Sequence, residues 1–492
     1  MDYDPVTRSG NKASAETAGE NWTGHRRLAK DTVSGAVIQP QASTVKPASL
    51  PTSRDPQALK TTLKRGHMAS FVGVFLFTVV VYFRPYEMFS WLSWAKSMAF
   101  VIAIATLVIY VPTQLGLEGN LTTRPREINL VLLLALAALL SIPLAFDKAE
   151  AFYGFNEYFK VVLMFIVMVN VVRTEKRLKL MLLLVLITSC IVSAAAINDY
   201  RLGIFLRDLA RNRIRGSIGN LFDNPNDLAL HLVTMVPIAI GLLLGSRGVL
   251  KKLFFGGCAA LISVGVVTTF SRGGFIGLVC VIAVLAWRLA KSNKFLIVAG
   301  LPVVLVAFLL FAPGGYTSRM SSTTDDSGMA RREELKRSLY VALHHPLFGV
   351  GINNYVIYSD VNHATHNAYT QVASELGFPA MVVYIMFLIA PLKGVRRISR
   401  ETSANRRKSR YYYLAVGFEA SLIGFMVSSF FLSVAYLWYI YYLTGYAICL
   451  RRLYQSSQLE ENAAPVSKSR VVDEPAGRNL VPDMGLASTV NR

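Results

Sequence analysis

Long apolar stretches separated by short polar connections dominate this chain from about residue 67 onward. Most of them have about 16 to 22 residues. A helix of that length, rising about 1.5 Å per residue, crosses the roughly 30 Å hydrocarbon core of a bilayer. The pattern therefore predicts an all-α, polytopic integral membrane protein. About twelve spans are expected, over residues 68–84, 97–112, 128–146, 158–172, 178–198, 227–245, 253–270, 274–290, 294–312, 378–392, 412–432 and 434–450.

The two ends of the chain have a different composition. Residues 1–66 are rich in Ser, Thr, Pro, Ala and Lys without an apolar period, which is typical of a disordered segment. They lack the basic and apolar regions of a cleaved signal peptide, so we expect this tail to stay in the cytoplasm. Residues 453–492 are again polar and are expected to form a second disordered cytoplasmic tail. The transmembrane domain is thus predicted over residues 67–452.

The composition excludes an ordinary soluble domain. Of the 492 residues, 53% are hydrophobic, and the polar remainder could not cover the surface of a globule. The formal net charge is +21, but most Lys and Arg residues border apolar stretches, where such residues orient the spans. With a cytoplasmic N-terminus, each junction on the cytoplasmic side carries Lys or Arg. We therefore expect both termini in the cytoplasm, membrane lipid as a partner and no nucleic-acid binding.

Arginines also occur at three places on the opposite side, where the same rule disfavours them. Arg207, Arg211 and Arg215 recur every four residues after the fifth span, so a helix would present them as one stripe. Two interpretations stay open, namely an interfacial helix whose arginines reach lipid headgroups and a site that binds an anion. The segment continues to Asn224 and Asn226, one of which is expected to cap the sixth span.

A second outward arginine lies in the short sequence Phe270-Ser271-Arg272-Gly273-Gly274, between the seventh and eighth spans. The glycines allow a sharp turn and a close approach of the backbone to a ligand. The guanidinium of Arg272 can hold phosphate oxygens in a bidentate fork. The sequence favours an anion site here, and a plain turn with a headgroup contact is the alternative.

The third place is a polar loop, residues 313–377, which holds four of the seven histidines. Residues 331–344 predict an amphipathic helix. Arg331 lies four residues before Leu335 and eight before Leu339, so it is expected to share their inward face. A buried contact of Arg331 with an anion and a pair with the adjacent glutamates are both compatible with this pattern.

The histidines of this loop have two chemical interpretations. A neutral imidazole can act as a general base. A metal site could use the pair His363 and His366, but no cysteine and few well-spaced carboxylates lie nearby. His366 directly precedes a short predicted helix, residues 367–376, where the surrounding arginines would keep its imidazole neutral. The alternative for His366 is a capping or packing role.

Four motifs, taken in this order, resemble the O-antigen ligase and polymerase superfamily of bacterial inner membranes. The resemblance covers residues 200–390, with a compatible number of spans outside this range. Leu335, where the family often has an aromatic residue, and the long N-terminal tail depart from the family pattern. The motifs are Arg215-Gly216 followed by Asn224-Pro225-Asn226, then Ser271-Arg272-Gly273-Gly274, then Arg331 upstream of His345-Pro346-Leu347-Phe348-Gly349-Val350-Gly351, and His366-Asn367 with Glu375 and Gly377.

The resemblance implies an enzyme at the periplasmic face of the inner membrane. It would transfer a glycan from undecaprenyl diphosphate to an acceptor hydroxyl, without metal, cofactor or nucleotide sugar. His366 would accept the proton of the attacking hydroxyl. The residues implied in diphosphate binding are Arg215, Arg272 and Arg331. The further candidates for contacts with the acceptor or glycan are Glu375, Asn367 and Arg211.

Two other functions fit parts of the pattern. A transporter or flippase of lipid-linked oligosaccharide is expected to carry charges near the middle of its spans and internal repeats. This sequence has few mid-span charges and no obvious repeat. A structural protein that binds anionic lipid would leave His366 without a role. Within the enzyme class, the acceptor could be lipid A core, another lipid-linked glycan or a protein hydroxyl, so ligase, polymerase and protein O-glycosylation all stay open.

Overall fold

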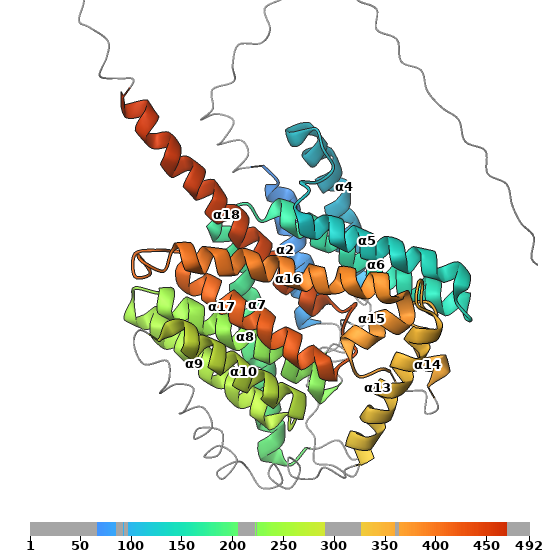
Figure 1. Cartoon of the computed structure of the whole chain (residues 1–492). Coiled ribbons are helices and arrows are strands. Elements are labelled where there is room, and N and C mark those ends of the chain that lie inside the picture. Colours follow the sequence, from blue (N-terminus) through green and yellow to red (C-terminus); the bar gives the residue numbers. More distant parts are fainter. Residues whose placement is uncertain are drawn as a thin grey trace, which may run out of the picture. The chain divides into compact units, whose positions relative to one another are not determined.

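The computed structural model describes residues 66–84, 92, 97–204, 222, 224–290, 326–359 and 364–469. The chain divides into two compact units, and all of these residues belong to the second unit, Pro56–Arg492. Within the described ranges this unit consists of helices and connections, without any strand (Figure 1). The predicted all-α fold of a polytopic membrane protein is confirmed.

Nine helices in the described part of the chain are long and apolar enough to cross a membrane. A shorter apolar helix, α2, and the first part of α18 bring to eleven the expected spans that coincide with described helices. The expected span 294–312 lies outside the described residues. The helices at these spans are α2 (Met68–Phe83), α4 (Met98–Glu118), α5 (Arg126–Ser141), α6 (Lys148–Val171), α7 (Glu175–Leu202), α8 (Pro225–Gly245), α9 (Val249–Thr268), α10 (Arg272–Leu289), α16 (Phe378–Glu401), α17 (Tyr412–Ser428) and α18 (Trp438–Ser469).

Five further elements connect these helices. The 3-10 helix η2 (Ile142–Leu144) follows α5, and η5 (Ser429–Phe431) follows α17. Three helices precede α16 in the predicted polar loop: α13 (Asp326–His344), α14 (Tyr355–Tyr358) and α15 (Ala368–Leu376).

Helix α18 continues past its apolar part. We expected an irregular tail from residue 453, but the helix ends only at Ser469. Tyr454 is buried, and its ring contacts that of Tyr411, just before α17. The next residues include Gln, Leu, Glu and Ala, which favour helix. Aromatic packing and local propensity therefore extend the helix where apolar periodicity alone predicts its end.

Side-chain caps fix where several spans begin. The side chains of Asp147, Thr174 and Asn224 accept hydrogen bonds from N–H groups in the first turns of α6, α7 and α8. These N–H groups have no partner within their own helix. Pro225, at the first position of α8, needs no such partner because it has no N–H. Of the two asparagines expected as caps of this span, Asn224 is the one that caps it.

Charged contacts between helices gather at one level of the unit, which we call the basic end. There, Glu419 of α17 accepts hydrogen bonds from Arg288 of α10 and Arg396 of α16. Arg451 of α18 holds Glu127 of α5 in a bidentate pair. Both glutamates are buried. These pairs tie five helices together where their polar connections begin.

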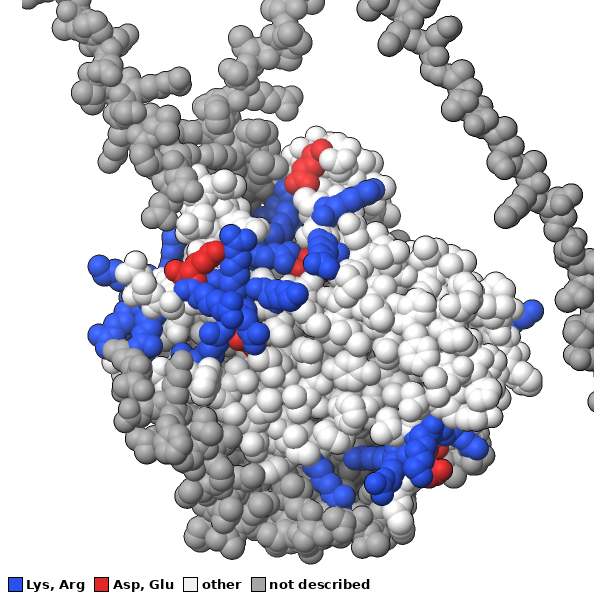
Figure 2. All heavy atoms as spheres, in the orientation of Figure 1, with Lys and Arg blue, Asp and Glu red and all other residues white. Residues whose placement is uncertain are grey.

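The opposite level, which we call the loop end, carries α13 to α15, the connection from α5 to α6, and the starts of α8, α10 and α16. Asn354, just before α14, accepts a hydrogen bond from the backbone N–H of Asp147 at 2.8 Å and donates to the Asp147 carbonyl at 3.0 Å. Figure 2 shows two groups of Lys and Arg separated by an uncharged band. The unit therefore has the charge distribution of a membrane protein that crosses a bilayer between its two ends.

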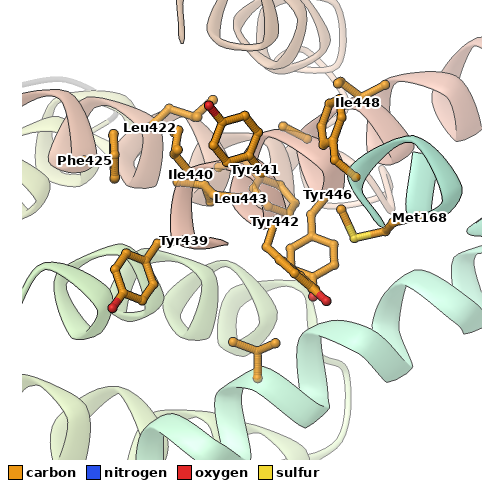
Figure 3. Packing of buried hydrophobic residues seen from close by; sticks show 14 of the residues in the cluster. Met168, Leu422, Phe425, Tyr439, Ile440, Tyr441, Tyr442, Leu443, Tyr446 and Ile448 are labelled. Carbon is orange, nitrogen blue, oxygen red and sulfur yellow. The ribbon is translucent and has the colours of Figure 1, made fainter. Parts of the chain in front are cut away.

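Large side chains fill the region between the two ends. Small residues let the helices approach closely there, since packing replaces the hydrophobic effect within lipid. A Cβ atom at Gly241 of α8 would lie 2.7 Å from a carbonyl oxygen of the segment that begins α17, and one at Gly417 of α17 would lie 2.6 Å from a carbonyl oxygen of α8. The two glycines therefore let α8 and α17 pack closely against each other. Figure 3 shows other side chains of the core, among them Tyr441, Tyr446, Leu443, Phe425 and Met168.

Replacing Glu419 should destabilise the basic end strongly. Glu419→Ala leaves the two arginines without their shared carboxylate, and removing one partner of a buried ion pair costs about 3 to 5 kcal/mol. We expect a loss of this size in the free energy of unfolding, measured by denaturant titration in detergent micelles. Glu401→Ala is the matched control, because Glu401 lies near the surface and its ion pair is with the exposed Arg397 on the same helix. Equal effects of the two substitutions would contradict the role of Glu419.

Candidate functional site

The start of α10 is tied to the start of α8 through side chains. Ser271, the cap of α10, accepts a hydrogen bond from Gly274 N–H at 3.2 Å and donates one to Asn226 Oδ1 at 2.8 Å. Asn226 Nδ2 in turn donates to Asn224 Oδ1 at 3.0 Å. Arg272 is the first residue of α10 and is half-buried. A guanidinium at a helix N-terminus combines two features that favour anions.

The two glycines of this motif permit close contacts on two sides. A Cβ atom at Gly274 would lie 2.4 Å from Ala229 Cβ on α8, and one at Gly273 would lie 3.1 Å from Phe431 Cβ in η5. Larger residues would push the start of α10 away from both neighbours. The motif therefore sets Arg272 between α8 and the connection that follows α17.

The predicted short helix at residues 367–376 is present as α15. Asn367 Oδ1 accepts hydrogen bonds from the N–H groups of Tyr369 and Thr370 at 2.9 and 3.0 Å. Asn367, and not His366, is therefore the residue whose side chain caps α15. The other side-chain atom of this cap, Asn367 Nδ2, is buried and makes no hydrogen bond within the described part of the chain.

His366 lies half-buried in front of this cap, and its backbone has the left-handed φ of +52°. The connection between α17 and α18 holds that backbone. His366 N–H donates to Ser433 Oγ at 2.8 Å, and the hydroxyls of Thr365 and Ser433 lie 2.9 Å apart. The loop that carries His366 is thus attached to a span that follows it by more than sixty residues.

Residues 428–433 connect the two motifs in space. Ser428 donates to the carbonyl of Gly273 at 3.4 Å, next to Arg272, and Ser433 accepts from His366 at the other end of the stretch. Elements η5 and α15 also contact each other, as η5 and α10 do. The same short connection therefore positions the arginine of α10 and the histidine before α15 at the loop end (Figure 1).

Arg331 lies on α13 and is half-buried. The prediction that Arg331 shares an inward face with Leu335 and Leu339 is wrong, because Leu339 is 47% exposed. Glu334 is buried instead, and its carboxylate accepts hydrogen bonds from Tyr355 Oη at 2.6 Å and Ser359 Oγ at 2.7 Å. An apolar pattern cannot reveal a buried carboxylate whose partners come from another helix. Among the residues of α13 whose side chains the structure describes, those that are buried are Glu334, Ser338, Val341 and Ala342.

The His-Pro-Leu-Phe-Gly-Val-Gly motif, residues 345–351, folds against the end of α15. The backbone N–H groups of Val350 and Gly351 donate to the carbonyls of Ser374 and Glu375, each at 2.9 Å. These carbonyls belong to the last turn of the helix, where no N–H of the helix itself is available. The motif therefore caps α15 at its C-terminus and fixes the helix that His366 precedes.

Glu375 lies beneath this turn and is only 4% exposed. Burial raises the pKa of its carboxyl to about 8, although the nearby Tyr436 hydroxyl and the backbone N–H of Asn353 favour the charged form. Glu375 Oε2 makes no hydrogen bond within the described residues. The carboxyl is thus mainly protonated at neutral pH, inside the site rather than on its surface.

The structure places five of the seven predicted site residues. Arg272 and His366 share one supporting connection, and α13 with Arg331 packs against α15, which holds Asn367 at its start and Glu375 at its end. Within the described residues, no group of three or more His, Cys, Asp and Glu side chains could hold a metal ion. The other two, Arg211 and Arg215, lie outside the described ranges, as do Arg207 of the same stripe and His363 of the alternative metal pair.

Sequence reasoning missed the residues that bring these motifs together. Asn226 was considered only as a cap, although it bonds Ser271. Ser433 and Tyr436 received no role at all. For Ser433, the sequence offers one signal: three serines, Ser428, Ser429 and Ser433, interrupt the apolar sequence between the last two spans.

Replacing Gly349 should displace the end of α15. Its φ is +65°, and a Cβ atom there would lie 2.2 Å from the backbone carbon of Glu375. We expect Gly349→Ala to lower the free energy of unfolding by at least about 2 kcal/mol, since both the clash and the left-handed backbone oppose a side chain. Gly257→Ala is the control, because a Cβ atom at Gly257 meets nothing within 4 Å. Comparable stability of the two variants would contradict this contact.

The raised pKa of Glu375 predicts a pH-dependent stability. Between pH 4.5 and about 8, the folded protein holds a proton that the unfolded chain has released. Stability is therefore full below pH 4.5 and falls as the pH rises to about 8. Glu375→Gln should remove this fall. At about pH 9, its free energy of unfolding should exceed that of the wild type by on the order of a few kcal/mol. Denaturant titrations over this range test it, with the exposed Glu157→Gln expected to keep the wild-type slope.

Comparison with known proteins assigns the central part of this chain. Residues 257–385 match the model of a family described as O-Antigen ligase. The match runs from α9 into α16, so it includes Arg272, Arg331, His366 and the buried Glu375. A comparison with curated proteins gives no match. Residues 257–385 of this multi-pass membrane protein therefore form a domain of the O-antigen ligase and polymerase superfamily.

Proposed function

We propose that this protein transfers a glycan from undecaprenyl diphosphate to an acceptor hydroxyl at the periplasmic face of a bacterial inner membrane. The observation that carries the proposal is the connection 428–433, which supports the helix start with Arg272 and the turn with His366 together. The O-Antigen ligase match spans both residues and supports the reaction class. The positive-inside rule favours a cytoplasmic basic end, and a cytoplasmic location of both termini is part of the proposal.

Arg272 binds the diphosphate in this proposal. Its guanidinium can hold two phosphate oxygens at once, and its place at a helix N-terminus adds the partial positive charge of the helix. Fixed positive groups stabilise the charge that develops on the diphosphate as the bond to the sugar breaks. Arg331 and Arg215 are assigned to the same ligand. The glycan then lies toward the start of α15.

His366 is the general base of the proposed reaction. The acceptor oxygen attacks the anomeric carbon while His366 takes the hydroxyl proton. The bond between this carbon and the diphosphate oxygen breaks, and the diphosphate leaves with the electron pair. The proton on the imidazole then passes to solvent. A single displacement of this kind inverts the anomeric configuration.

Three residues are assigned to the acceptor side. Asn367 Nδ2, which makes no hydrogen bond within the described part of the chain, is a donor suited to a glycan or acceptor oxygen. Arg211 is assigned to the same side. Glu375 acts by orienting α15, since it is buried. The acceptor itself needs only a reactive hydroxyl, so lipid A core, a second lipid-linked glycan and a protein side chain all satisfy this chemistry.

Substitution of His366 or Arg272 should abolish most of the transfer activity. Loss of a general base typically lowers the rate by about 10²- to 10⁴-fold, and loss of a group that stabilises developing charge by about 10²- to 10³-fold. We expect losses in these ranges for His366→Ala and Arg272→Ala in proteoliposomes that contain undecaprenyl-diphosphate-linked glycan and acceptor. The readout is the amount of glycan joined to the acceptor.

Matched controls separate this chemistry from general damage to the loop. His344→Ala and Arg332→Ala change a histidine and an arginine that are exposed on α13, and both should retain activity. Full transfer by His366→Ala would exclude the proposed base. Movement of the lipid-linked glycan across the bilayer without transfer to any acceptor would instead support a transporter.

A further inference from the structure

We infer that Ser433 is a positioning residue that sets the place of His366 for proton transfer, an inference that rests on the function proposed above. Ser433 lies in the connection between α17 and α18, outside the segment that matches the ligase family. It acts through the backbone that carries the base. Its hydroxyl has two partners, one on each side of the peptide bond between Thr365 and His366.

The hydrogen atoms of this group can be assigned by counting donors. Thr365 Oγ1 donates to the Asn367 carbonyl at 3.0 Å, so its only hydroxyl hydrogen is used there. Ser433 must then be the donor in the 2.9 Å contact between the two hydroxyls. Ser433 Oγ also accepts the hydrogen bond of His366 N–H at 2.8 Å. The hydroxyl of Ser433 is therefore used both as donor and as acceptor.

The backbone of His366 needs this support. Its φ of +52° is in the left-handed region, which costs a residue with a side chain about 1 to 2 kcal/mol relative to the ordinary regions. A net hydrogen bond contributes about 0.5 to 1.5 kcal/mol, which is of similar size. Without the Ser433 hydroxyl, other backbone conformations become accessible to His366, and they point its imidazole elsewhere.

The segment that includes Ser433 is itself fixed along α15 and against α10. Gln371 Oε1 accepts a hydrogen bond from Ala435 N–H at 3.2 Å, one turn along α15. Tyr369 Oη donates to the Met426 carbonyl at 2.8 Å, near the end of α17. Ser428, earlier in the same connection, reaches Gly273 beside Arg272. The segment with Ser433 therefore links the position of His366 to α10, the helix that begins with Arg272.

A matched pair of substitutions tests the hydroxyl without a change of shape. Both variants add a methyl group and have the same shape, but Ser433→Thr keeps the hydroxyl whereas Ser433→Val has a second methyl group in its place. Because a displacement of about 1 Å can cost about 100-fold in rate, we expect Ser433→Val to lower kcat about 10- to 100-fold. The KM for undecaprenyl-diphosphate-linked glycan should stay near the wild-type value, since Ser433 does not bind the donor. Ser433→Thr should recover most of the rate.

A second comparison tests whether Ser433 acts through His366. In the His366→Ala background, Ser433→Val should cause no further loss, because the base that it positions is absent. Ser429→Ala is the control for the connection, because it removes a hydroxyl whose partners are the Met426 carbonyl and the Tyr369 side chain, and it should retain the wild-type rate. All variants are compared at equal amounts of folded protein in proteoliposomes.

The outcomes separate this inference from the proposed function. Equal rates of Ser433→Val and Ser433→Thr, with His366→Ala inactive, would overturn the role of Ser433 and leave the proposed base in place. A further loss from Ser433→Val in the His366→Ala background would also overturn it, since the effect would not pass through the histidine. Full activity of His366→Ala would remove the proposed function itself.

Discussion

The absence of water from the hydrocarbon core is the constraint on which this structure depends. A backbone N–H or C=O group in lipid must find its partner within its own helix. The chain can therefore leave helical geometry only near the ends of its spans, where its ion pairs between helices also gather. Both polar levels of this unit follow from that requirement. At the basic end, buried glutamates meet arginines of neighbouring helices. At the loop end, short helices and turns carry the polar side chains and provide hydrogen-bond partners for the ends of the spans.

Helix α15 shows how a short element becomes rigid under this constraint. It has nine residues, too few to be stable alone in water. Its first N–H groups are bound by Asn367 and its last carbonyls by the turn at residues 345–351. The connection between α17 and α18 lies along its side. Partners at both ends and along one face replace the stability that its length cannot provide.

The sequence was sufficient where one physical rule acts along the chain. Apolar length predicts eleven of the described spans, and local hydrogen-bonding chemistry predicts the start and end of α15 and limits the cap of α8 to Asn224 or Asn226. It failed where the partner is distant. The buried face of α13 includes Glu334, whose carboxylate accepts hydrogen bonds from two hydroxyls of the α14 region. A pattern of apolar residues cannot predict such a buried charge. The contact between Ser433 and His366 joins residues that only the packed helices bring together.

The buried Glu375 has a consequence for the electric field at the loop end. If the protein binds a diphosphate as proposed, a charged carboxylate at Glu375 would repel it and weaken its attraction to the arginines. Because its pKa is raised to about 8, Glu375 remains mainly uncharged at neutral pH and adds little to that repulsion. A carboxyl group can then pack inside α15 without adding a negative charge near Arg272. The same carboxyl would make the loop end less attractive to anions in alkaline surroundings.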